Sequence, residues 1–142
     1  MKTLSLKEIK YTAPWFSKVS PRQPDANYNV PKLSWVKEKL IPFYFSWIKG
    51  QQLSEYSEKF DCDDFSTWFR MLAKACHRHS SGTAESLSVF EIWYNAQGTG
   101  GVNGNHSIIA VYTGKWVFIE PQNGTVYDLT KDEINSIFHV IA

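Results

Sequence analysis

The chain has 142 residues, with 15 basic and 14 acidic side chains and a net charge of +1. This length fits one domain over residues 1–142, because domains usually comprise about 100–200 residues. The balanced charge argues against the strongly basic surface that nucleic acid or anionic lipid would require, so neither is expected as a partner. Aromatic residues make up 15% of the sequence, which predicts a bulky core and some aromatic surface for ligand contact.

The first residues carry no targeting or membrane-spanning signal. Lys2 and Lys7 flank a stretch without an apolar segment, which does not fit a secretory signal. The longest apolar run, over residues 43–48, is far shorter than the roughly 18 residues of a membrane span. We therefore expect a soluble, cytoplasmic protein without a membrane partner.

The first third of the chain predicts little regular structure. Residues 1–30 are rich in Pro, Ser and Asn and predict an irregular arm. Pro31 is expected to open a helix over residues 31–40, and Pro42 to end or kink it. Residues 43–48 fit either a short buried helix or a strand.

The clearest predicted helix begins near Asp61. Small and apolar residues recur at helical spacing from Cys62 to Cys76 and form one continuous stripe. Acidic residues occupy the first turn and basic residues the last, as the helix dipole favours. The two cysteines are too far apart along this helix for a disulfide. Both are expected as free thiols, which fits a reduced compartment.

After residue 86 the pattern changes to strands. The glycine-rich segment 97–105 predicts a flexible loop, and Thr113-Gly114 predicts a tight hairpin turn. Thr130 followed by Glu133 predicts a capped terminal helix over residues 130–138. Helices followed by antiparallel strands indicate an α+β fold. The strand-like runs cover residues 87–94, 107–112, 115–120 and 125–128.

Four residues could form a thiol-based catalytic site. Cys62 lies at the start of the predicted helix, where the dipole and unpaired N–H groups favour a thiolate. His106 begins a strand directly after the glycine-rich loop, a suitable place for a general base. Counting back across the predicted hairpin places His106 opposite position 121, beside Glu120, whose carboxylate could orient the imidazole. Gln122 is a candidate amide donor to an oxyanion.

Each of these residues also has a purely structural interpretation. Free cysteines are among the most buried residue types, and Cys76 is expected to be one of these. His106 could simply cap a strand edge. Glu120 to Gly124 could be an ordinary turn after a strand, and a one-residue error in register would separate Glu120 from His106.

Three segments together resemble a known family. Asp61–Phe65 at a helix start, Asn105–Ser107 on a strand and Glu120–Gly124 after a hairpin resemble the papain-like C-terminal protease domain of the fairy-ring mushroom agglutinin and its stand-alone relatives. The resemblance covers roughly residues 55–128. It implies a minimal papain-like fold, with the cysteine-bearing helix packed on an antiparallel sheet.

The resemblance also implies an activity and a metal. It implies a cysteine protease acting on a peptide or protein substrate, with Cys62, His106 and Glu120 as its triad and Gln122 at the oxyanion hole. It further implies dependence on calcium, held by acidic residues next to the cysteine. Carboxylate oxygens suit Ca²⁺, and the ion would neutralise the acids around a thiolate. The implied calcium ligands are Asp61, Asp63 and Asp64.

Three functional interpretations remain open on the sequence alone. The first is a thiol hydrolase that cleaves peptide or isopeptide bonds or transfers acyl groups. The second is a catalytically inactive binding module of the same fold, in which aromatic surface recognises a ligand. The third is a structural protein with two inert cysteines. The sequence determines neither the substrate nor the oligomeric state.

Overall fold

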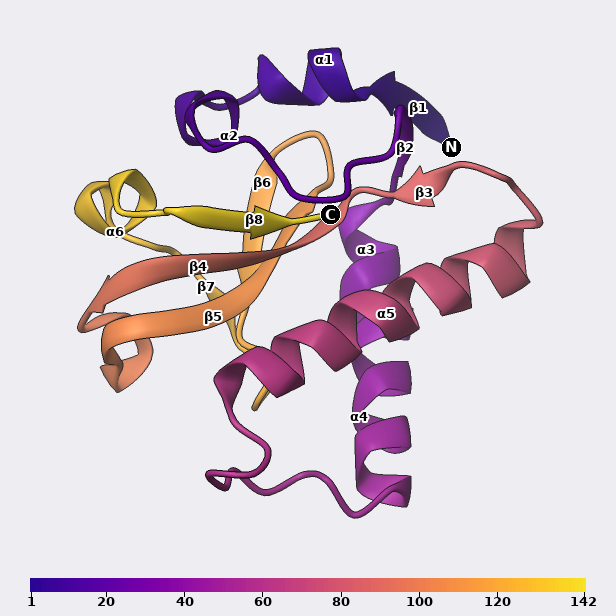
Figure 1. Cartoon of the computed structure of the whole chain (residues 1–142). Helices are drawn as coiled ribbons and strands as arrows, with labels where there is room; N and C mark the ends of the chain where they lie inside the picture. The colour runs from indigo at the N-terminus through magenta and orange to yellow at the C-terminus, as the bar shows by residue number, and fades with distance from the viewer.

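The computed structural model describes all residues from 1 to 142. Figure 1 shows a long helix, α5, crossing beneath a twisted sheet, with the N-terminal segment above that sheet. The helices are α1 (Leu6–Lys10), α2 (Pro14–Lys18), α3 (Leu33–Trp35), η1 (Val36–Leu40), α4 (Ile41–Gly50), α5 (Cys62–Ser81), η2 (Thr99–Gly101) and α6 (Lys131–Asn135). The strands are β1 (Lys2–Ser5), β2 (Asn27–Val30), β3 (Ser86–Leu87), β4 (Val89–Gln97), β5 (Asn103–Tyr112), β6 (Trp116–Ile119), β7 (Val126–Tyr127) and β8 (His139–Ile141).

The strands form two sheets. The larger one is antiparallel throughout, in the order β7-β6-β5-β4-β8. The smaller one has the order β1-β2-β3, and its β2–β3 pair is parallel. Because side chains alternate across a strand, the larger sheet presents apolar residues to both sides. On β5, for example, Ile108 belongs to one core cluster and Ile109 to the other.

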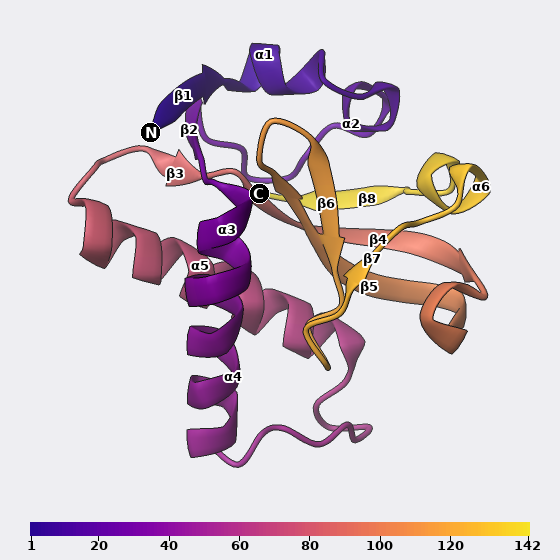
Figure 2. The same cartoon turned by 180° about the vertical axis from the view of Figure 1, so that it is seen from behind.

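A different layer covers each face of the larger sheet. The helices α4 and α5 cover one face, where Phe65 and Phe69 pack among its strands. The N-terminal segment covers the other, where Trp15 and Phe16 are buried. Figure 2, from behind, shows both layers with the sheet between them.

The N-terminal segment is therefore folded, not an irregular arm. Ser5 and Glu8 cap α1 reciprocally, since the Ser5 N–H donates to the Glu8 carboxylate and the Glu8 N–H donates to the Ser5 hydroxyl. Pro14 occupies the first turn of α2, where its missing N–H costs nothing. The apolar side chains of this segment pack against a face of the larger sheet that would otherwise be exposed. This tertiary contact determines the structure of the N-terminal segment.

Pro42 does not end the second helical segment. The chain runs from α3 through the π-helical turn η1 into α4, and Pro42 lies in the first turn of α4. Proline lacks a backbone N–H donor, and the wider π turn before it changes the hydrogen-bonding pattern at this point. The helical segment from α3 to α4 therefore continues past Pro42. Residues 43–48, left open between helix and strand, lie in α4.

The sequence predicted a minimal papain-like α+β fold, with one helix on one antiparallel sheet. That expectation is corrected by the structure, which has two sheets, a parallel strand pair and covering layers on both faces. Strand β8, which pairs with β4, was also missed. The capped helix after Thr130 is confirmed, and so are the two free cysteines.

Candidate functional site

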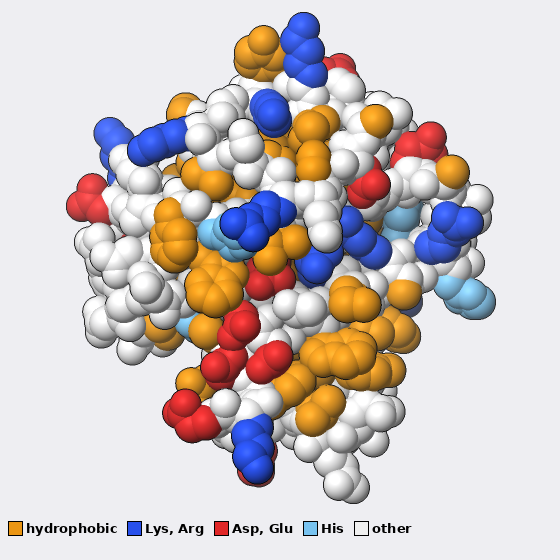
Figure 3. Space-filling model, viewed as in Figure 1, with side chains coloured by type: hydrophobic (Ala, Val, Ile, Leu, Met, Phe, Trp, Pro, Cys, Tyr) orange, Lys and Arg blue, Asp and Glu red, His pale blue; other side chains and the backbone are white.

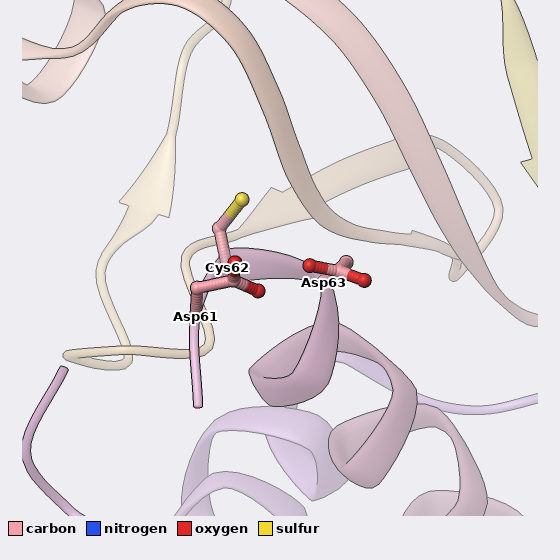
Figure 4. Close-up of side chains that lie close together, drawn as sticks. All are labelled: Asp61, Cys62 and Asp63. Atoms are coloured by element: carbon pink, nitrogen blue, oxygen red, sulfur yellow. The ribbon is translucent and has the colours of Figure 1, made fainter. Parts of the chain in front are cut away.

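Cys62 is the first residue of α5, next to two carboxylates. Asp61 precedes the helix in extended conformation, and its N–H donates to the Asp64 carboxylate at 3.2 Å. This contact satisfies backbone and side-chain groups at the helix start. Figure 4 shows the Cys62 sulfur pointing away from the helix, with the carboxylates of Asp61 and Asp63 nearby.

His106 and Glu120 form a buried pair. His106 lies on β5 and Glu120 directly follows β6, with only 5% and 2% of their surfaces exposed. The Nε2 atom of His106 lies 2.6 Å from a Glu120 carboxylate oxygen. Burial alone would lower the pKa of His106, but its interactions with Cys62 and Glu120 outweigh burial and raise the pKa to about 9. The imidazole is therefore positively charged at neutral pH.

The pair brings the three predicted residues together. Since Nε2 of His106 is occupied by Glu120, Nδ1 is the ring nitrogen left for a second partner. Cys62 contributes to the raised pKa of His106, so the thiol lies near the ring, although no hydrogen bond joins the two side chains. A thiol next to an imidazolium can form a thiolate–imidazolium pair, the arrangement that makes a cysteine nucleophilic.

The hairpin register differs from the predicted one by one residue. The structure pairs Ile109 with Ile119, and continuing this register sets His106 opposite position 122 instead of 121. Glu120 then lies two residues away on the same face, so a diagonal contact joins it to His106. His106 and Glu120 are in contact despite the one-residue error in the predicted register, because alternate residues share one face of a strand.

Further hydrogen bonds hold Glu120 in place. One carboxylate oxygen accepts the backbone N–H of Gln122 at 3.1 Å, and the other lies 3.4 Å from the Tyr127 hydroxyl, which donates to it. Its own N–H donates to the Thr125 carbonyl. Gln122 thus reaches the site through its backbone, and its side-chain amide, the predicted oxyanion donor, forms no hydrogen bond in the structure.

The predicted calcium ligands separate into two groups. Asp61 and Asp63 lie with Cys62 in a cluster whose candidate ligand atoms are all within 4.8 Å of one another. Asp64 instead accepts the Asp61 N–H. A hydrogen bond with Asp61, burial and the neighbouring charges raise the pKa of Asp63 to about 6. Figure 3 shows acidic side chains gathered on the surface near the start of α5.

The donor set of this cluster fits a hard cation in part. One Asp61 oxygen is buried without a hydrogen-bond partner. Both carboxylates suit Ca²⁺. The Cys62 sulfur does not, because calcium prefers oxygen ligands.

Two tyrosines belong to the site although the sequence analysis did not identify them. Tyr94 lies directly across from His106 on β4, with an edge-on ring contact at a centroid distance of 5.9 Å. Its hydroxyl is buried without a partner. Burial raises the pKa of Tyr127 to about 12, helped by the Glu120 charge, so it stays a neutral donor. Pairing the strands 87–94 and 107–112 in sequence could have identified Tyr94.

A second histidine and the second cysteine lie away from this site. His77 is buried on α5 and hydrogen bonds to Asn29, while Cys76 lies at the far end of the same helix. Burial raises the pKa of the Cys76 thiol. These residues are structural in their present contacts.

None of the helices combines the length and the apolar character that crossing a membrane requires.

The chain was compared with known families, characterised proteins and solved structures. No family model matches it, and no characterised protein matches it by sequence. One similar solved structure is the Polyporus squamosus lectin bound to the human-type influenza-binding epitope Neu5Acα2-6Galβ1-4GlcNAc, with a TM-score of 0.68 and 19% identity. Another, described as a PSL1a–E64 complex, has a TM-score of 0.66 and 19% identity. Both matches cover 99% of this chain, but only 49% and 51% of the matched chains.

These comparisons correct the sequence-based identification. The chain was identified as a papain-like cysteine protease domain, hence as a thiol hydrolase with a peptide or protein substrate. The matched structures are instead described as a lectin with a bound glycan and as a PSL1a complex, and no family model supports a protease domain. The protease identification and the enzyme assignment are therefore withdrawn. At this identity the likeness establishes a shared fold, over about half the length of each matched chain.

Proposed function

We propose that the chain is a ligand-binding domain whose ligand contacts the cluster of Cys62, His106 and Glu120. The observation that carries this proposal is the buried 2.6 Å contact between His106 and Glu120, next to the Cys62 thiol. Burying such a pair costs desolvation energy, and groups with strongly shifted pKa values cluster at functional sites. The similarity to a solved PSL1a–E64 complex supports a ligand site in this fold.

The proposed roles of the residues follow from their chemistry. Cys62 would be the nucleophilic group, since its thiol stands at the helix start near the His106 ring. His106 would supply that charge, and Glu120 would orient the ring and stabilise its protonated form. Gln122 would offer its side-chain amide to an oxygen of the ligand, while its backbone N–H holds Glu120.

Calcium is a further part of this proposal. Asp61 and Asp63 would hold Ca²⁺ beside the helix start, and Asp64 would stabilise the segment through its bond to the Asp61 N–H. When bound, the ion would supply positive charge that neutralises the carboxylates next to the thiol. The unpartnered Asp61 oxygen supports this assignment.

The test uses E64 as the probe and the intact mass of the protein as the readout. The proposal expects E64 to add its mass to the wild-type chain and to the Cys76→Ser variant. Cys62→Ser should remove the adduct while leaving the circular dichroism spectrum unchanged. An adduct that survives in Cys62→Ser, or no adduct with folded wild-type protein, would refute the assignment of Cys62.

A second candidate function is carbohydrate binding. It rests on one observation, the similarity in fold to the Polyporus squamosus lectin bound to a sialylated trisaccharide. Isothermal titration with this trisaccharide and with the neutral disaccharide Galβ1-4GlcNAc would test it. No heat with either sugar at millimolar concentration would exclude this candidate and leave the thiol site untouched.

A further inference from the structure

A cavity of about 400 Å³ lies between α3 and η1 on one side and the strands β6 and β7 on the other. This volume is within the range of about 300–1,000 Å³ that is typical of small-molecule sites. Figure 2 shows α3 and the strands β6 and β7 on the same side of the molecule. The residues that matter for its chemistry are Leu33, Lys37, Lys115, Trp116, Tyr127 and Asp128.

The charged groups at this cavity lack partners within the chain. Lys37, Lys115 and Asp128 line it, and none of their side chains forms an ion pair or hydrogen bond in the structure. All three are exposed. Two ammonium groups and one carboxylate are therefore free to contact a bound molecule.

Two aromatic residues of the lining, Trp116 and Tyr127, are held in place by contacts within the chain. The Trp116 ring packs against Trp15 at a centroid distance of 4.7 Å, and its indole N–H donates to the Thr12 hydroxyl at 2.8 Å. The Tyr127 hydroxyl donates a hydrogen bond to the Glu120 carboxylate. Tyr127 is buried, so Trp116, which is half-buried, supplies the aromatic surface that a ligand can reach. Such surface packs well against the C–H face of a sugar ring.

We propose that this cavity binds a sugar that carries a carboxylate. Lys37 and Lys115 would bind the carboxylate by charge-assisted hydrogen bonds, and Asp128 would accept hydrogen bonds from hydroxyl groups. Trp116 would pack against the ring. The proposal rests on the second candidate function above and adds the location of the site and the chemical class of the ligand.

The experiment compares an acidic sugar with its neutral counterpart by isothermal titration. Wild-type protein should bind Neu5Acα2-6Galβ1-4GlcNAc at least about tenfold more tightly than Galβ1-4GlcNAc, since one charge-assisted hydrogen bond is worth that factor or more. The double variant Lys37→Ala, Lys115→Ala should lose this preference. Lys39→Ala is the matched control, because Lys39 is also exposed on η1 but does not line the cavity.

The outcomes separate the two proposals. If neither sugar binds, the carbohydrate function itself fails. If the acidic sugar binds and the double variant keeps the full preference, the cavity assignment is overturned. If the double variant binds both sugars more weakly by the same factor, the lysines do not contact the carboxylate. That result also overturns the cavity assignment. The Trp116 indole resonance should shift on binding of the acidic sugar, and an unchanged resonance with saturated protein would contradict the location.

Discussion

The Nε2 atom of His106 and a carboxylate oxygen of Glu120 lie 2.6 Å apart, and both side chains are buried. The two residues come from different strand segments, at the end of β6 and within β5. Burial lowers the pKa of His106, but the interactions with Cys62 and Glu120 outweigh it and raise the pKa. A charged pair is thus kept at the edge of the core, beside a thiol at a helix start.

Replacing Glu120 by Gln should lower the pKa of His106. The change keeps the shape of the side chain and a hydrogen-bond acceptor but removes the negative charge, so the value should fall from about 9 towards the ordinary 6.5. NMR titration of the histidine ring protons measures this directly. His77, whose pKa is lowered by burial, is the internal reference and should not move. A His106 pKa that stays near 9 would show that Glu120 is not its charge partner.

Local signals in the sequence were sufficient for several elements. The stripe from Cys62 to Cys76 and the acidic first turn predict α5, and the Thr130–Glu133 pattern predicts α6. These elements carry their own periodicity or capping. The sequence also predicted that His106 and Glu120 lie close together, because a hairpin places residues of its two strands at definable positions.

Other features depend on contacts that no local pattern contains. The segment around Trp15 and Phe16 is ordered by the sheet face it covers, and β8 exists because β4 offers it an edge. The π-helical turn before Pro42 joins α3 to α4 in one continuous helical segment. Tyr127 reaches Glu120 only once the register of β6 and β7 is known. Tertiary packing decides these points, and propensity does not.

The raised pKa of His106 predicts that stability falls between pH 6.5 and 9. A histidine whose pKa is higher in the folded state contributes stability that is fully present below its unfolded pKa of about 6.5 and is lost as the pH rises through about 9. Urea unfolding at half-unit pH intervals measures the effect. His106→Gln should remove this slope, and an identical slope in the variant would assign it to other groups. His77 has a lowered pKa, so its contribution falls below this window.

Calcium binding should weaken sharply below about pH 6. The pKa of Asp63 is raised to about 6 in the metal-free chain, so protons compete with the ion below that value. Titration calorimetry of chelator-treated protein at pH 5 and pH 7.5 would measure the difference, with Mg²⁺ as the control ion. Asp63→Asn should bind weakly at both pH values. Equal affinity of the wild-type protein at the two pH values would contradict the assignment of Asp63.

Gly100→Ala should destabilise the chain more than Gly101→Ala. Both glycines have positive φ angles, +67° and +76°, so alanine costs similar backbone strain at each position. At Gly100 the added methyl group would also overlap the Tyr127 ring and hydroxyl, whereas at Gly101 it meets nothing within 4 Å. Overpacking of this kind costs about 1–3 kcal/mol. Chemical denaturation of the two variants side by side gives the difference, and equal loss in both would mean that Tyr127 moves freely. If Tyr127 is fixed by its bond to Glu120, Gly100→Ala should also shift the His106 ring resonances, while Gly101→Ala should not.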